Sequence, residues 1–272
     1  MRQFSHSSPD EEIIFKTIKR EAHRIHENEP ILNKYVLEEV IINESLSFCV
    51  TSIISKKIAT SSISANVLQE LFNSVIHEQP ELSRATSRDL IAVRERDAAT
   101  TSYISILLNQ KGFHAIQLHR LTHSLWNKQR RDLALHLQGL NSQTFGVDIH
   151  PACAMGSGIM IDHATGVVIG ETCTIEDDVS IMQSVTLGGT GKESGERHPK
   201  IRRGAMIGAG AIILGNIEVG TYAKVGAGSV VITSVPDNAT VVGVPAQIVK
   251  SFSKENSSKI AGEVCVSRSL EQ

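Results

Sequence analysis

Apolar residues recur at every sixth position through the second half of this 272-residue chain. Stepping by six from residue 149 meets only apolar residues: Ile149, Met155, Ile161, Val167, Cys173, Val179 and Val185. After an interruption, a second series is wholly aliphatic: Ile201, Ile207, Ile213, Val219, Val225 and Val231. An α-helix repeats every 3.6 residues and an ordinary strand every two, so neither sustains this period. The period of six therefore predicts a solenoid.

A parallel β-helix is the solenoid that a hexapeptide period indicates. Three hexads would make one triangular coil, with one apolar side chain of each hexad pointing inward. Small residues such as Ala205 and glycines such as Gly208 suit the corners, where the backbone turns tightly. Thirteen hexads predict a little over four coils, and similarity to known hexapeptide repeats implies that the coils are left-handed.

The preceding residues follow a helical period instead. From about Glu11 to Gln138, apolar residues lie three or four positions apart, and glycine is absent until Gly112. Between residues 113 and 126 we expect His114, His119, Arg120 and His123 to lie mostly on a solvated helix face. The predicted class is α+β, with a helical domain at 1–143, a left-handed β-helix at 144–250 and a polar, flexible tail at 251–272.

Composition excludes several classes of protein. The formal net charge is −2, so the chain has no overall basic character to attract nucleic acid. The four cysteines form no C-x-x-C pair, which favours a reducing compartment over a disulfide framework. The N-terminus turns acidic where a secretory signal would be apolar, and no apolar run could span a membrane. We predict a soluble, cytoplasmic protein.

The interruption in the repeat is the stretch LGGTGKESGERHPKI, residues 187–201. It resembles a phosphate-binding loop, but that motif needs glycine where Thr186 stands and Ser or Thr where Glu193 stands. We predict instead an extruded loop of about ten residues, at about 188–200, that projects from the wall of the solenoid between two coils. Because the flat faces of a solenoid invite side-by-side packing, we expect a threefold assembly with a cleft between neighbours.

Three blocks of the second half carry a specific resemblance. VDIHPACAMGSGIMIDHATGVVIGE, QSVTLGGTGKESGERHPKI and IGAGAIILGNIEVGTYAKVGAGSVV together closely resemble the serine acetyltransferases. The similarity is dense over residues 85–250 and looser before them. It implies transfer of an acetyl group from acetyl-CoA to L-serine, the first step of cysteine biosynthesis from serine.

This chemistry needs a base to take the proton of a weakly nucleophilic hydroxyl. The resemblance assigns His163 as the base and Asp148 as the carboxylate that orients it. Their separation of 15 residues, just short of one 18-residue coil, allows them to lie on adjacent coils. For the serine zwitterion, the resemblance implies Asp97 and Asp162 on the ammonium and Arg197, with His198 close by, on the carboxylate.

The resemblance also implies where acetyl-CoA binds. Gly189 would offer its amide near the transferring acetyl group, and the cofactor would lie in a groove between subunits. The implied contacts are Gly189, Thr190, Ala209, Lys224 and Ala227. No metal is expected.

Further partners follow from the family alone. The resemblance implies trimers or dimers of trimers joined through the helical halves, and feedback inhibition by L-cysteine at the serine site. Many members insert a C-terminal isoleucine into the active site of O-acetylserine sulfhydrylase. This sequence ends at Gln272, which departs from that pattern.

Three alternatives remain open at this point. A hexapeptide acyltransferase acting on a sugar or homoserine would not need the amino-acid set of Asp97, Asp162 and Arg197. A zinc hydratase would use His150, His163 and His198 as ligands. A non-catalytic scaffold would have no reason to keep both His163 and Asp148.

Overall fold

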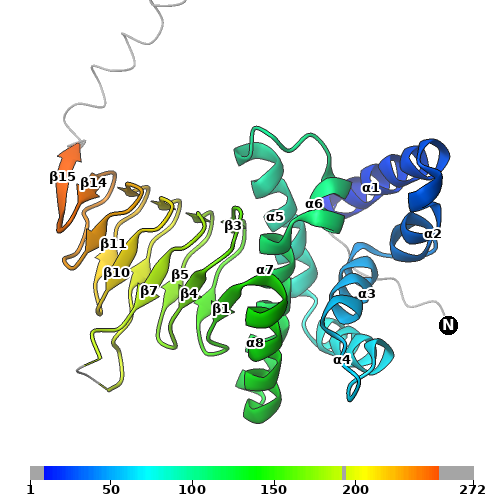
Figure 1. Cartoon of the computed structure of the whole chain (residues 1–272), viewed down its shortest axis with the longest axis horizontal. Helices are drawn as coiled ribbons and strands as arrows, with labels where there is room; N and C mark the ends of the chain where they lie inside the picture. The colour runs from blue at the N-terminus through cyan, green and yellow to red at the C-terminus, as the bar shows by residue number, and fades with distance from the viewer. Residues whose placement is uncertain (1–8, 192–193, 251–272) are drawn as a thin grey trace, which may run out of the picture.

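The computed structural model describes residues 9–191 and 194–250. Helices fill the N-terminal part of the chain, and a stack of short strands fills the C-terminal part (Figure 1). The two parts lie end to end along the long axis of the molecule, with α5, α7 and α8 closest to the first coil of the stack (Figure 1). The predicted order, a helical part followed by a β-helix, is confirmed. The predicted tail at 251–272 lies outside the described residues.

The helical part contains eight α-helices among the described residues. They are α1 (Pro9–Asn28), α2 (Asn33–Val36), α3 (Leu46–Ile58), α4 (Ala65–Glu78), α5 (Glu81–Arg96), α6 (Tyr103–Asn109), α7 (Lys111–Asn127) and α8 (Arg131–Phe145). A 3₁₀ turn, η1 (Pro30–Leu32), and a π turn, η2 (Leu37–Ile41), flank α2. Ser45, Ser64 and Ser102 cap α3, α4 and α6, each accepting a backbone N–H at the helix start. None of these helices is long and apolar enough to cross a membrane.

Helix α7 runs through the middle of the helical part, and here one prediction was wrong. His114, His119 and Arg120 are buried and His123 is half-buried, so these residues do not form a solvated face. The reason is that α7 has neighbours on every side, since it contacts α3, α4, α5 and α8 as well as β1 and β3. The polar side chains bond inside the protein: His114 Nε2 lies 2.7 Å from the Leu107 carbonyl oxygen and His119 Nε2 3.1 Å from that of Cys153.

The strands form three walls of a prism. The first wall contains β1 (Val147–Ile149), β4 (Val167–Ile169), β7 (Thr186–Gly188), β10 (Ile212–Leu214) and β13 (Val230–Val231). The second contains β2 (Ala154–Met155), β5 (Thr174–Ile175), β8 (Lys200–Ile201) and β11 (Glu218–Val219). The third contains β3 (Met160–Ile161), β6 (Ser180–Ile181), β9 (Met206–Ile207), β12 (Lys224–Val225), β14 (Thr240–Gly243) and β15 (Ala246–Lys250). All pairs are parallel except β14 with β15, so the predicted parallel β-helix is confirmed.

The register between coils corrects the predicted phase of the repeat. Ile149 pairs with Ile169 twenty residues later, whereas Ile169 pairs with Leu187 after the expected eighteen. The first coil therefore holds two extra residues, and they fall between β3 and β4, around His163. The first wall has two columns of inward-facing residues, one through Ile149 and Ile169 and the other through Val147 and Val167. The steps of six passed from the first column to the second at Val167 and remained apolar because Val147 and Val167 are both fully buried.

The same register shortens the predicted extruded loop. Leu187 pairs with Ile213 twenty-six residues later, so this coil carries eight extra residues rather than ten. The loop connects Gly188, at the end of β7, to Lys200, at the start of β8. The earlier count was too long because Val185 and Ile201 belong to different inward columns.

The helical part joins the prism through a buried ion pair. Asp89 on α5 is wholly buried and accepts two hydrogen bonds of 2.8 and 3.0 Å from Nη2 of Arg120 on α7. Asp89 also accepts the backbone N–H of Ile159 in the first coil, and Arg120 donates to the carbonyl oxygen of Gly156. Burial raises the pKa of Asp89, and the Arg120 guanidinium opposes that rise. The pair thus fixes two helices against one coil.

Gly112 marks a second close contact between the two parts. A Cβ at this position would lie 1.9 Å from the carbonyl oxygen of Ile161. Only glycine lets the start of α7 approach the third wall this closely. Beside it, Lys111 donates to the Thr165 hydroxyl, just after His163.

Candidate active site

His163 projects from the edge between the third and first walls, which we call the His163 edge (residues 162–166, 182–185, 208–211 and 226–229). The backbone is left-handed at both His163, with φ 55°, and Ala164, with φ 62°. Non-glycine residues in this region cost free energy, and such strain is concentrated at functional sites. The two extra residues of the first coil create this turn, and the His163 side chain is 71% exposed.

Asp162 is the partner that the structure gives His163 within one chain. Its Oδ1 accepts the His163 backbone N–H at 2.9 Å, and its Oδ2 lies 3.6 Å from His163 Nε2. Asp148 lies on β1, in register with Val168 of β4, and its Oδ1 accepts a hydrogen bond of 2.5 Å from Gln138 Nε2. The predicted pairing of His163 with Asp148 is therefore not among the contacts of a single chain, and it stays a prediction.

Asp97 lies at the C-terminal end of α5. Its two oxygens accept hydrogen bonds from the Ala99 N–H at 2.8 Å and from the Thr100 hydroxyl at 2.5 Å. The Thr100 hydroxyl lowers the pKa of Asp97, and the Gln110 amide adds to this effect. Gln110 precedes Lys111, which contacts Thr165, so these contacts bring Asp97 toward the turn that carries Asp162 and His163.

Helix α5 is anchored where it delivers Asp97. Arg96 Nη1 donates to the carbonyl oxygens of Gly158 and Asp178, at 3.0 and 2.9 Å, and to the Ser180 hydroxyl at 3.2 Å. Arg88 makes further contacts with Ser157 and Asp178 of the same corner. These contacts fix the end of α5, and with it Asp97, against the corner that carries Gly158 and Asp178.

Arg197 and His198 occupy a different edge, between the first and second walls, which we call the Arg197 edge (residues 150–153, 170–173, 189–191, 194–199 and 215–217). Arg197 Nη2 lies 2.6 Å from Glu171 Oε2, and the guanidinium lowers the pKa of Glu171. Thr172 anchors the base of the loop, since its hydroxyl oxygen accepts the backbone N–H groups of both Arg197 and His198 at 3.1 Å.

His198 is held as a neutral imidazole. Its Nδ1 accepts the Thr172 backbone N–H at 3.2 Å, so the proton of the neutral ring is on Nε2. Burial lowers the pKa of His198, and the charge of Arg197 lowers it further. The ring lies over Gly170, where a Cβ would come within 2.0 Å of His198 Cδ2, and a Cβ at Gly189 would lie 3.5 Å from its Nε2. The site therefore offers an N–H donor beside the glycine predicted to face the acetyl group.

The predicted cofactor residues are divided between the two edges. Ala209 and Ala227 lie on neighbouring coils of the His163 edge, where the Gly228 N–H donates to the Ala209 carbonyl oxygen at 2.8 Å. Lys224 is exposed on β12 of the adjoining third wall. Gly189 and Thr190 follow β7 on the Arg197 edge, with Thr190 against Gly215. Within one chain, the predicted cofactor residues therefore lie on two separate edges of the prism.

Two side chains that the sequence analysis missed touch predicted site residues. Glu171 pairs with Arg197, and Gln138 bonds to Asp148. Glu171 stands in the G-E dipeptide that closes the first resembling block, which was a signal available from the sequence. Gln138 lies in the middle of α8, outside the repeat, and nothing in the sequence distinguishes it from any other half-buried helix residue.

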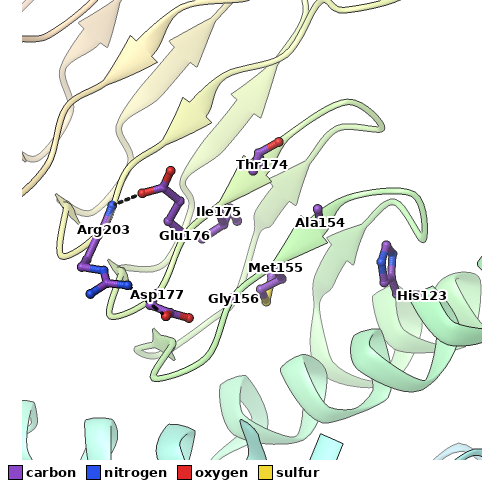
Figure 2. A pocket seen from close by; sticks show the side chains of 9 residues that line it. All are labelled: His123, Ala154, Met155, Gly156, Thr174, Ile175, Glu176, Asp177 and Arg203. Atoms are coloured by element: carbon purple, nitrogen blue, oxygen red, sulfur yellow. Dashed lines mark hydrogen bonds and ion pairs between the residues drawn. The ribbon is translucent and has the colours of Figure 1, made fainter. Parts of the chain in front are cut away.

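A pocket of about 430 Å³ opens elsewhere, between α7 and the second wall (Figure 2). Its charged lining is already paired: Arg203 lies 3.4 Å from Asp177, and Glu176 lies 2.8 Å from Arg202. None of the predicted site residues lines it. Within residues 9–191 and 194–250, no three His, Cys, Asp or Glu side chains are grouped to hold a metal ion, so His150, His163 and His198 do not converge there.

Fold and sequence together define a transferase built on hexapeptide repeats. Residues 198–233 match the family model described as bacterial transferase hexapeptide (six repeats). Residues 14–118 match the model described as serine acetyltransferase, N-terminal. The serine acetyltransferase of Haemophilus influenzae is 51% identical over 236 residues, covering 87% of this chain and 88% of the relative. The chain belongs to the serine acetyltransferase family.

Solved structures of relatives agree with this assignment. A serine acetyltransferase in complex with cysteine has a TM-score of 0.86 and 50% identity, covering 88% of this chain and 99% of the other. The Brucella abortus enzyme in complex with coenzyme A has a TM-score of 0.87 and 46% identity, covering 89% and 96%. The soybean enzyme complexed with serine has a TM-score of 0.87 and 48% identity, covering 89% and 100%.

Proposed function

We propose that this chain is a serine O-acetyltransferase, which converts acetyl-CoA and L-serine to O-acetyl-L-serine and CoA. Membership of the family supports the reaction, and relatives bound to serine and to coenzyme A support the two substrates. The observation that carries the proposal here is His163, exposed on a strained two-residue insertion beside Asp162.

In the proposed mechanism, His163 takes the proton of the serine hydroxyl as its oxygen attacks the thioester carbonyl carbon. Asp148 orients the imidazole and stabilises the imidazolium, as the acid of a triad does. The Gly189 amide faces the oxyanion of the tetrahedral intermediate. When the C–S bond breaks, the imidazolium returns its proton to the departing CoA thiolate.

Recognition of serine would use groups of both signs. Asp97 and Asp162 carry negative charge toward the ammonium group, and Arg197 carries positive charge toward the carboxylate. The Nε2–H of neutral His198 is available as a further donor to that carboxylate. L-Cysteine differs from serine only in the reacting atom, so we propose that it competes at this site, as the cysteine complex of a relative supports.

We further propose that the active site forms between copies of this chain. The predicted site residues are divided between the His163 edge and the Arg197 edge of one prism, so a second prism beside the first would bring them together. The first wall between them exposes apolar side chains, with Val168 at 41% and Ile212 at 37% exposure. This supports the expected trimer, or dimer of trimers, and light scattering during size-exclusion chromatography measures it.

Two further predictions belong to the same proposal. Cys49, Cys153 and Cys173 are buried free thiols, which fits a reaction carried out in the reducing cytoplasm. A complex with O-acetylserine sulfhydrylase would depend on residues 251–272, which lie outside the described part of the chain. Mixing the purified full chain with the sulfhydrylase tests that partner directly.

Release of CoA thiol from acetyl-CoA tests the proposed reaction. We expect release that depends on L-serine and exceeds release with L-homoserine or a sugar acceptor. His163→Ala should lower kcat by at least about 100-fold, the scale of general-base catalysis, while the oligomer keeps its size. Turnover with a sugar but not with serine, or full activity in His163→Ala, would contradict the proposal.

A further inference from the structure

The Asp148 carboxylate is held by a residue from outside the prism. Gln138 lies on α8 in the helical part, ten residues before Asp148, and its Nε2 is 2.5 Å from Asp148 Oδ1. An ionised carboxylate only accepts hydrogen bonds, so the amide presents its NH₂ group and not its oxygen. Both side chains are half-buried, which protects the contact from competing water.

The backbone between the two residues leaves little freedom. Helix α8 ends at Phe145, Gly146 turns in the left-handed region with φ 70°, and β1 begins at Val147. Gly146 is itself fixed to the His163 turn, since its carbonyl oxygen accepts the Gly166 N–H at 2.8 Å. The contact of α8 with β1 therefore holds Gln138 over the first strand of the first wall.

We infer that Gln138 is a positioning residue for the proposed reaction, which sets the orientation of Asp148. This inference rests on the proposed function. By bonding one carboxylate oxygen, the amide selects one rotamer of Asp148 and leaves the other oxygen to face an imidazole.

Two substitutions of similar size separate this role from simple packing. Gln138→Met keeps the length of the side chain and removes the donor. We expect kcat to fall about tenfold at every pH, the effect of one charge-assisted hydrogen bond, with the KM values for serine and acetyl-CoA within about twofold of wild type.

Gln138→Glu places a second carboxyl group against Asp148. The two carboxyl groups share one proton at lower pH and repel each other once both are ionised. We expect the ratio of kcat in Gln138→Glu to kcat in wild type to fall as pH rises from about 6.5 to 9, whereas the ratio for Gln138→Met stays constant. A packing role would give no such difference between the two pH profiles.

Gln143→Met is the matched control, because Gln143 is exposed on the same helix. Its kcat should equal that of wild type. Thermal unfolding and oligomer size identify any variant that fails to fold. If Gln138→Met fails to fold, the near-isosteric Gln138→Glu still tests the inference.

Asp148→Asn separates failure of this inference from failure of the proposed function. No serine-dependent thiol release by the wild type would refute the proposed function, and full activity in Asp148→Asn would refute the assigned role of Asp148. A strong loss in Asp148→Asn with wild-type kcat and pH profile in both Gln138 variants would overturn the inference alone. We expect Gln138→Met to add little on the Asp148→Asn background, because both changes act on one interaction.

Discussion

Inside the prism the buried side chains are nearly all aliphatic, whereas the helical part buries charged and polar groups beside its apolar ones. Among the described residues of the prism, the buried polar side chains are Ser180, His198 and Ser229. The helical part buries Asp89, Arg120, Gln117, His114 and His119, among others.

The difference follows from how each architecture satisfies its backbone. In the prism, each coil pairs with the next through its strands, so the interior needs only a column of apolar side chains. The helical part packs helices of different lengths around α7 and onto the end of the prism, where specific polar contacts join them. Regular repeats can therefore be recognised from a local pattern, while an irregular junction depends on particular pairs.

The largest expected effect comes from breaking the polar junction. Arg120→Met would leave the fully buried Asp89 without its cation, and an uncompensated buried charge costs about 3–5 kcal/mol. Urea unfolding followed by circular dichroism measures the change in the free energy of unfolding. Asp89→Asn added to Arg120→Met should recover part of the loss, because it removes the unpaired charge. Wild-type stability in Arg120→Met would contradict the view that the helical part depends on specific polar pairs.

Acid should weaken the helical part through its buried histidines. Burial lowers the pKa of His114 to about 4 and that of His119 to about 3, below the ordinary value of 6.5. The unfolded chain binds these protons first, so the stabilisation is complete above about pH 6.5 and is lost as pH falls toward 4. At pH 5 the loss is on the order of 2 kcal/mol for each histidine.

Urea unfolding between pH 8 and pH 5 measures this loss. His119→Gln should flatten the dependence, whereas His136→Gln, at an exposed position on α8, should leave it unchanged. An equal slope in wild type and His119→Gln would show that the buried ring does not titrate in this way.

Replacing two glycines by alanine should change the stability of the protein in opposite directions. Gly112→Ala would force a Cβ to within 1.9 Å of the Ile161 carbonyl oxygen, and relieving that overlap should cost about 1–3 kcal/mol. Gly139 lies in the middle of α8, and a Cβ added there would meet no neighbouring atom within 4 Å. Gly139→Ala should instead stabilise the protein by about 0.5–1 kcal/mol. Thermal unfolding of both variants measures these shifts, and a stabilising Gly112→Ala would mean that α7 and the third wall can separate without cost.

The sequence predicted the prism well and its details less well. A period of six recurs within each coil, so it identified the parallel β-helix and the interruption by a loop. It did not reveal the two-residue insertion at His163, because the next inward column is equally apolar. The excess length assigned to the loop came from the same ambiguity.

The helical period correctly predicted that a helix covers residues 113–126, but it wrongly predicted which of its side chains are exposed. Residues 113–126 do form part of a helix, but His114, His119 and Arg120 are buried. An amphipathic pattern predicts one buried face, and it cannot predict that a helix will be surrounded by others.

By itself, the sequence determined the solenoid and the family, because hexads act within a few residues and the family blocks are contiguous. Only the tertiary structure decided that Asp89 meets Arg120, that Gln138 meets Asp148 and that the proposed site residues divide between two edges. Such pairs depend on where whole helices and coils come to rest against one another, and no short stretch of chain encodes that placement.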